Sequence, residues 1–167
     1  MLRKNYYLIW VAALVTSLLV ATPANAKSSK KTVKGPTGQT LTVSATNVKD
    51  GQVVTATGKK YNRKIGIYLA YCVINAKGVA PGPCGGGVNA TGESDGSIWI
   101  SSNPPAYGKS LAVPFSKSGG FKQKVKVSRY IGDVDCAVAK CGVVTRADHT
   151  KSSNRKADVI VRVKFKK

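Results

Sequence analysis

The chain has 167 residues, and its 27 lysines and arginines face only 7 acidic residues, for a formal net charge of +20. This length fits one domain with a single core that buries enough surface to fold alone. No stretch beyond the first 26 residues is apolar for long enough to cross a membrane, which excludes a membrane-spanning domain.

The first 26 residues have the pattern of a cleaved export signal. Arg3 and Lys4 precede an uncharged apolar run over 6–20, and Ala24-Asn25-Ala26 forms a small-residue cleavage site. Cleavage after Ala26 leaves 141 residues with 25 basic and 7 acidic side chains, a charge of +18. The sequence therefore predicts a secreted, extracellular protein in an oxidising compartment, with association to the cell surface as an added expectation.

Residues 27–38 are rich in lysine, serine and threonine and are predicted to form a flexible basic arm or tether. The domain is expected over residues 39–167. A charge of +18 attracts polyanions, so non-specific DNA, anionic lipid or an anionic cell-wall polymer is an expected partner.

Short runs of β-branched and aromatic residues alternate with turn signals along the domain, and none has the periodicity of an amphipathic helix. The run over 65–74 is apolar almost throughout, which is typical of a central strand. The pattern predicts an all-β, antiparallel sandwich of seven strands, at 40–44, 52–57, 65–74, 97–101, 121–127, 142–146 and 159–165.

The four cysteines allow three pairings. Local loops favour Cys72 with Cys84 and Cys136 with Cys141. The absence of a C-x-x-C pair and the single histidine, His149, argue against a zinc site.

Several segments together resemble one known family. They are Leu41-Thr42-Val43-Ser44, Asp50-Gly51-Gln52-Val53-Val54, the spacing of Cys72 and Cys84, and Val134-Asp135-Cys136 followed five residues later by Cys141. The chain resembles the neocarzinostatin family of secreted actinobacterial apoproteins over about residues 41–165. The resemblance implies an immunoglobulin-like fold with two local disulfides and an apolar ligand cleft beside them. It also implies antibiotic chromophore carriage, DNA binding and antibacterial defence.

The resemblance implies three ligand-cleft positions in this chain. Its aromatic positions fall on Ile74 and Lys126, and a polar position falls on Arg146. The residue types depart from the family, and this chain is basic where the family's carriers are acidic. The resemblance therefore implies the family fold with a different ligand.

Alternation along 65–74 divides that strand into two faces. We assign Ile67, Leu69 and Val73 to the core, and Tyr68, Ala70 and Cys72 to a ligand cleft, with the reverse assignment left open. The Gly85-Gly86-Gly87 run beside Cys84 lacks side chains, so Gly85 and Gly86 would let a ligand approach the backbone closely.

Trp99 and Tyr107 are candidate pocket residues, although a core position for Trp99 is slightly favoured over a ligand role. Asp148, His149 and the serines that follow do not make a catalytic triad by sequence proximity, so no enzyme activity is expected.

The sequence therefore predicts a monomeric, non-enzymatic binding module for a small apolar ligand, with no cofactor and no metal. One alternative is a cationic surface protein that adheres to DNA, cell wall or membrane. Another is an exported haem or siderophore carrier using Tyr68, Tyr71, Tyr107 and His149.

Overall fold

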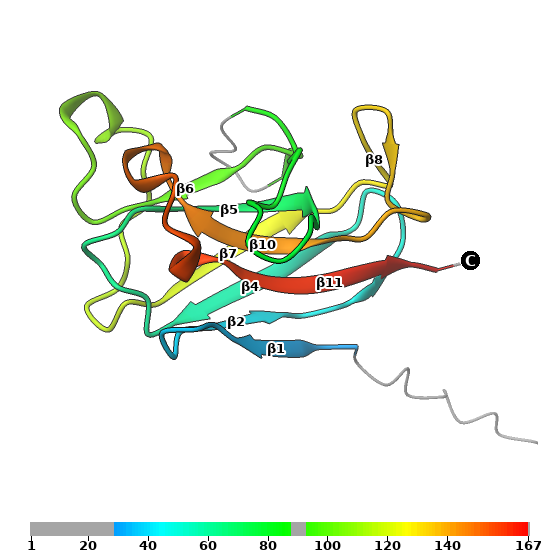
Figure 1. The fold of residues 1–167 in the computed structure, drawn as a ribbon, viewed down its shortest axis with the longest axis horizontal. Helices are drawn as coiled ribbons and strands as arrows, with labels where there is room; N and C mark the ends of the chain where they lie inside the picture. Colours follow the sequence, from blue (N-terminus) through cyan, green and yellow to red (C-terminus); the bar gives the residue numbers. More distant parts are fainter. Residues whose placement is uncertain (1–28, 88–92, 167) are drawn as a thin grey trace, which may run out of the picture.

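The computed structural model describes residues 29–87 and 93–166. Two β-sheets face one another across an apolar core, and a short two-stranded ribbon lies at one end of them (Figure 1). The predicted leader over 1–26 lies outside the described residues.

The first sheet has four strands in the spatial order β1-β2-β4-β7, and the second has five in the order β3-β11-β10-β5-β6. The four-stranded sheet is formed by β1 (Lys31–Lys34), β2 (Thr40–Val43), β4 (Val53–Lys59) and β7 (Phe121–Lys126). The five-stranded sheet is formed by β3 (Asn47–Val48), β11 (Val159–Phe165), β10 (Cys141–Ala147), β5 (Ile67–Val73) and β6 (Ile98–Ile100). The ribbon joins β8 (Tyr130–Ile131) to β9 (Val134–Asp135).

All seven predicted strands are present, and the predicted all-β sandwich is confirmed. The four additional strands, β1, β3, β8 and β9, are two to four residues long, which is too short to produce a clear alternation in the sequence. One pair departs from the expected antiparallel arrangement, because β3 runs parallel to β11.

The predicted flexible arm over 27–38 is wrong over Lys31–Lys34, which forms a strand. Lys31–Lys34 pairs with β2 along its whole length, and the hydroxyl groups of Thr32 and Thr42 are 2.8 Å apart. Val33 packs against the core. The sequence obscured this strand because Val33 is the single apolar residue among lysines and a threonine.

The core assignment of β5 is confirmed. Ile67, Leu69 and Tyr71 point into the core between the sheets, while Ala70 and Cys72 belong to a separate apolar cluster on the outer side. Both predicted disulfides are formed, with Cα–Cα distances of 4.0 Å for Cys72–Cys84 and 5.5 Å for Cys136–Cys141.

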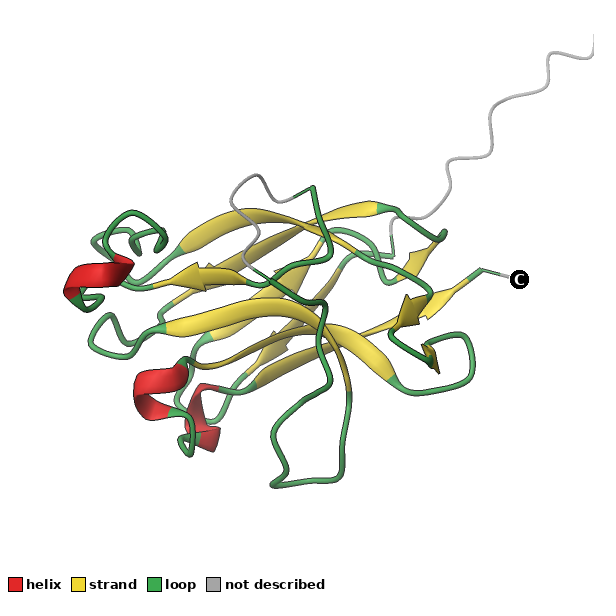
Figure 2. Cartoon of the chain, turned by 90° about the horizontal axis from the view of Figure 1, so that it is seen from above, coloured by secondary structure: helices red, strands yellow, loops and turns green. Residues whose placement is uncertain are grey.

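Three single-turn 3₁₀ helices lie at the same end of the strands (Figure 2). They are η1 (Ala106–Gly108), η2 (His149–Lys151) and η3 (Arg155–Ala157). Among the described residues no helix has the length and apolar character needed to span a bilayer.

Candidate ligand-binding site

The outer side of the five-stranded sheet carries a small apolar cluster of its own. Ala70 and Cys72 on β5 lie opposite Val144 and Gly142 on β10, and Ala70, Cys72 and Val144 are fully buried. The loop after β5 turns back along the strand, where Gly85 N donates to Tyr71 O at 3.0 Å and Val73 N donates to Pro83 O at 2.9 Å. The Cys72–Cys84 disulfide joins this returning segment to β5.

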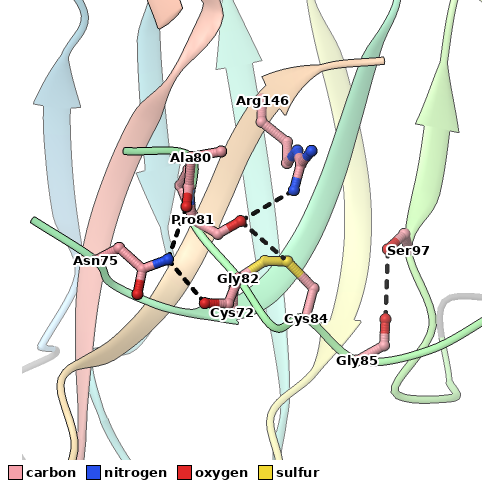
Figure 3. Close-up of a disulfide and its surroundings, with 9 residues drawn as sticks. All are labelled: Cys72, Asn75, Ala80, Pro81, Gly82, Cys84, Gly85, Ser97 and Arg146. Atoms are coloured by element: carbon pink, nitrogen blue, oxygen red, sulfur yellow. Dashed lines mark hydrogen bonds between the residues drawn. A yellow bond between two sulfur atoms is a disulfide. The ribbon is translucent and has the colours of Figure 1, made fainter. Parts of the chain in front are cut away.

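Arg146 and Asn75 hold the loop over that cluster (Figure 3). The Arg146 guanidinium donates to Pro81 O at 3.0 Å, and Asn75 Nδ2 donates to the carbonyls of Ala80 and Gly82. Because Ala70 has no exposed surface, the predicted cleft over Ala70 and Cys72 is closed by this chain's own loop. Arg146 acts here as a clamp on the loop.

Further along the same outer side, four rings from four separate elements meet. Tyr68 on β5 lies opposite Trp99 on β6, and Tyr107 from η1 and His149 from η2 complete the group. The ring centroids of His149 lie 5.0 Å from Trp99, 6.0 Å from Tyr68 and 6.1 Å from Tyr107. We call these four residues the aromatic cluster.

Both nitrogens of His149 are engaged by tyrosines. The Tyr68 hydroxyl is 2.6 Å from Nδ1 and the Tyr107 hydroxyl is 2.6 Å from Nε2. A neutral imidazole has one N–H and one lone pair, so it accepts from one phenol and donates to the other. Burial, and then the negative charge of Asp148, raise the pKa of Tyr68, which keeps its phenol protonated. The hydrogen-bonded chain fixes the orientation of all three rings.

Trp99 forms the base of the cluster and is itself held on two sides. Its Nε1 donates to Oδ2 of the buried Asp148 at 2.9 Å. The backbone of Gly108 lies against the indole ring so closely that a Cβ there would come within 2.3 Å of it. The indole therefore has a satisfied polar atom and a fixed position, as buried tryptophans generally require.

Asp148 connects the tryptophan to the histidine turn. Its Oδ1 accepts from the backbone N–H of Thr150 at 3.0 Å and from the Thr150 hydroxyl at 2.6 Å, which caps η2. Gly66 leaves the space for this carboxylate, because a Cβ at Gly66 would lie 1.9 Å from Oδ2. One buried carboxylate thus sets the positions of both Trp99 and His149.

The aromatic cluster borders a groove of about 320 Å³, and its lining is mainly apolar. This volume lies at the lower end of the range for small-molecule sites, which are typically lined by aromatic side chains with a few polar groups. Tyr107 is 65% exposed and Leu111 47% exposed at the rim, while Trp99 is only 5% exposed at the base. The groove is lined by Tyr68, Gly87, Ser97, Trp99, Tyr107, Leu111 and His149.

Comparison with solved structures finds matches to this chain, and macromomycin is among them. The chain resembles macromomycin in fold. The sequences are 17% identical, the TM-score is 0.49, and the match covers 77% of this chain and 99% of macromomycin. No family model and no curated protein matches the sequence.

Three of the predicted ligand residues, Tyr68, Trp99 and Tyr107, line the groove together. Gly85 and Gly86 lie beside it on the loop that leads to Gly87. A Cβ at Gly85 would lie 1.6 Å from Asp95 O, so this glycine serves close backbone packing, whereas Gly86 faces open space.

Ile74 and Lys126 do not join the other candidates. Ile74 follows the far end of β5 and bonds through its backbone N–H to Lys140 O. Lys126 lies on β7 in the other sheet and is 3.9 Å from an Asp95 oxygen. Both positions were inferred by counting from the cysteines, which does not follow the path of the chain between them.

Leu111, Ser97 and Asp148 were not predicted from the sequence to belong to the site. Leu111 was detectable in principle as a large apolar residue in a loop, whereas nothing in the sequence pairs Asp148 with Trp99.

Three residues of the alternative haem ligand set, Tyr68, Tyr107 and His149, meet in the aromatic cluster, but the fourth does not. Tyr71 belongs to the core on the opposite face of β5 from Tyr68. Among the described residues, no group of three or more His, Cys, Asp and Glu side chains is arranged to hold a metal ion.

Proposed function

We propose that this chain is a non-enzymatic binding protein that holds one small, flat, apolar molecule in the groove of the aromatic cluster. The observation that supports this most directly is the exposed apolar rim formed by Tyr107 and Leu111 above the nearly buried Trp99. Exposed apolar surface costs free energy in water, and a ligand that covers it recovers about 25 cal/mol per Å².

The rings are arranged before a ligand arrives. The Tyr68–His149–Tyr107 hydrogen bonds and the Trp99–Asp148 bond hold four side chains in place. Without these bonds, the side chains would lose rotamer freedom when a ligand binds. Each rotamer that is already fixed removes about 0.5–1.5 kcal/mol from the cost of association. The phenol and imidazole groups also offer hydrogen bonds to a polar edge of the ligand.

A binding role also accounts for the hydrogen bonds around His149. A hydrolytic triad needs a histidine between a carboxylate and a nucleophile. Here the side chain of Asp148 contacts Trp99 and Thr150, and both nitrogens of His149 bond to phenols. Asp148 and His149, which a triad would use to activate a serine, are therefore engaged in structural hydrogen bonds.

An extracellular location suits this function. All four cysteines are in disulfides, which form and persist in oxidising compartments. Export through the leader over 1–26 would place the groove in contact with small molecules outside the cell.

Trp99 is the sole tryptophan after the leader, so its fluorescence reports directly on the groove. We expect the neutral aromatic probe N-phenyl-1-naphthylamine to quench Trp99 on titration at high salt, where the lysines are screened. Tyr107→Ala should weaken binding by about 1–3 kcal/mol, the usual contribution of a large apolar side chain. The matched control is Tyr130→Ala, since Tyr130 is also exposed but lies on β8.

Equal affinities of wild type, Tyr107→Ala and Tyr130→Ala would remove the groove from consideration. A second test uses the natural ligand, which native mass spectrometry of the protein purified from its culture medium identifies. A co-purified apolar molecule that is lost in Tyr107→Ala is the expected result.

A further inference from the structure

The outer face of the four-stranded sheet is composed mainly of lysines and hydroxyl residues. Residues directly opposite one another in the register share a face, and the alternating burial of β2, β4 and β7 identifies the outward positions. Lys30 and Ser44 continue this face beyond the strand ends. The face consists of Lys30, Thr32, Lys34, Thr40, Thr42, Ser44, Val53, Thr55, Thr57, Lys59, Lys122, Lys124 and Lys126. We call it the lysine face.

Hydroxyl groups occupy the middle of the lysine face and lysines surround them. Lys122, Lys124 and Lys126 follow one another along β7 at alternate positions, about 7 Å apart. Lys34 and Lys59 lie on either side of Thr40, each one strand away from it. The result is a regular arrangement of cations around a row of threonines.

Two adjoining hollows run across this face. One of about 430 Å³ is lined by three lysines and four hydroxyl residues, and the other, of about 620 Å³, extends it toward Ser116 and Ser118. The two hollows share Thr57, Lys59 and Lys122, so they lie next to one another. Within the part of the chain that the structure describes, the hydroxyls of Thr55 and Thr57 have no hydrogen-bond partner and remain able to donate.

The positive charge of the lysine face is largely uncompensated. Glu93 lies 4.0 Å from Lys124, and Asp95 lies 3.9 Å from Lys126, and both pairs are exposed to solvent. Exposed ion pairs at such distances contribute little interaction free energy. No acidic residue of the described chain forms an ion pair with Lys30, Lys34, Lys59 or Lys122. A polyanion laid along these lysines would release the counterions that they hold.

The shape and chemistry of the face select among polyanions. Base stacking needs exposed aromatic rings, and this face has none, so it lacks what single-stranded nucleic acid binding uses. A four-stranded sheet is wider than the α-helix or two-stranded ribbon that the DNA major groove admits. Val53 is its one apolar residue, too little to insert into a membrane. A second copy of the chain would bring like charges together.

We propose that the lysine face binds an extended, flexible phosphodiester polymer whose phosphates are joined by small polyols rather than nucleosides. The phosphates settle between the lysines, and the threonine and serine hydroxyls donate to phosphate or polyol oxygens. This is the chemistry of anionic polymers of a cell envelope. The inference goes beyond the proposed ligand groove, which lies on the other sheet, and it would anchor the carrier at a surface.

The test uses fluorescence anisotropy with labelled linear poly(glycerol phosphate) and the processed, disulfide-bonded chain. The variant Lys30→Gln/Lys59→Gln/Lys122→Gln removes three lysines that line one hollow. Its matched control, Lys64→Gln/Lys77→Gln/Lys164→Gln, removes the same charge from exposed positions elsewhere. Unfolding temperatures of both should equal that of wild type, because these side chains are exposed.

We expect the lysine-face variant to bind at least about tenfold more weakly at 0.1 M salt and the control less than about threefold more weakly. The slope of log affinity against log salt should fall by about 2 in the variant, which corresponds to three lost phosphate contacts at roughly 0.7 each. Equal losses in both triple variants would overturn the proposal in favour of net charge alone, and so would an absence of binding.

Competition separates the other polyanions. We expect single-stranded DNA, duplex DNA and phosphatidylglycerol vesicles each to displace the polymer less effectively than unlabelled poly(glycerol phosphate). A competitor that binds more tightly, with the same dependence on Lys59 and Lys122, would reassign the face to that partner and overturn the choice of polymer.

Discussion

The outer faces of the two sheets have opposite characters, although the same alternation builds both. On the four-stranded sheet, lysines and threonines face solvent without a cover. On the five-stranded sheet, the outward positions Ala70, Cys72 and Val144 are completely buried under a loop that a disulfide ties down. An outward position in a strand is therefore not the same as an exposed one, and the loops decide between them.

The largest expected effect comes from releasing the covering loop. Cys72→Ala/Cys84→Ala should lower the free energy of unfolding by about 3 kcal/mol, from the entropy of the 13-residue loop alone. Exposure of the apolar cluster would add to this. Urea denaturation measures the loss, and the matched variant Cys136→Ala/Cys141→Ala should lose less, about 2 kcal/mol, because its loop is shorter. The reverse order would contradict the covering role of the first disulfide.

Two neighbouring glycines provide a smaller and sharper test of the same loop. A Cβ at Gly85 would overlap the backbone oxygen of Asp95, so Gly85→Ala should cost about 1–3 kcal/mol as overpacking does. A Cβ at Gly86 meets nothing within 4 Å, so Gly86→Ala should leave the thermal midpoint nearly unchanged. Differential scanning calorimetry compares the two. Similar costs for both would indicate that the loop moves freely above the sheet.

The smallest effect expected is a difference in alkaline stability between wild type and Tyr68→Phe. The folded state raises the pKa of Tyr68 above its usual 10.0, so it favours the neutral phenol. The contribution of this group to stability is full below pH 10 and declines as pH rises from 10 through the folded pKa. The stability difference between the two proteins, measured by urea unfolding at several pH values, should therefore shrink above pH 10. A stability difference that grows above pH 10 would indicate that folding lowers the pKa of Tyr68 and does not raise it.

Much of the fold was predictable because it depends on local patterns. Period-two alternation located the strands, as in Phe121, Val125 and the lysines between them on β7. The separations of the cysteines correctly indicated both disulfides. β1 was missed because its register with β2, and not its own composition, makes it a strand.

The site was predictable only in part. Tyr68, Trp99 and Tyr107 were recognised as aromatic residues on strands and loops that could line a pocket. Their relation to His149 was not predictable, because 81 residues separate it from Tyr68 and 42 from Tyr107. Contacts across such distances depend on how β5, η1 and η2 are brought to one end of the sandwich.

The sequence by itself determined which residues of each strand share a face, since side-chain direction alternates along any strand whatever its neighbours. It also determined the charge that makes the lysine face attract anions. Only the tertiary structure decided that one outer face is covered and the other open, and that four rings close around one groove. The reason is physical: coverage and ring contacts depend on loop paths and long-range pairing, which no local pattern encodes.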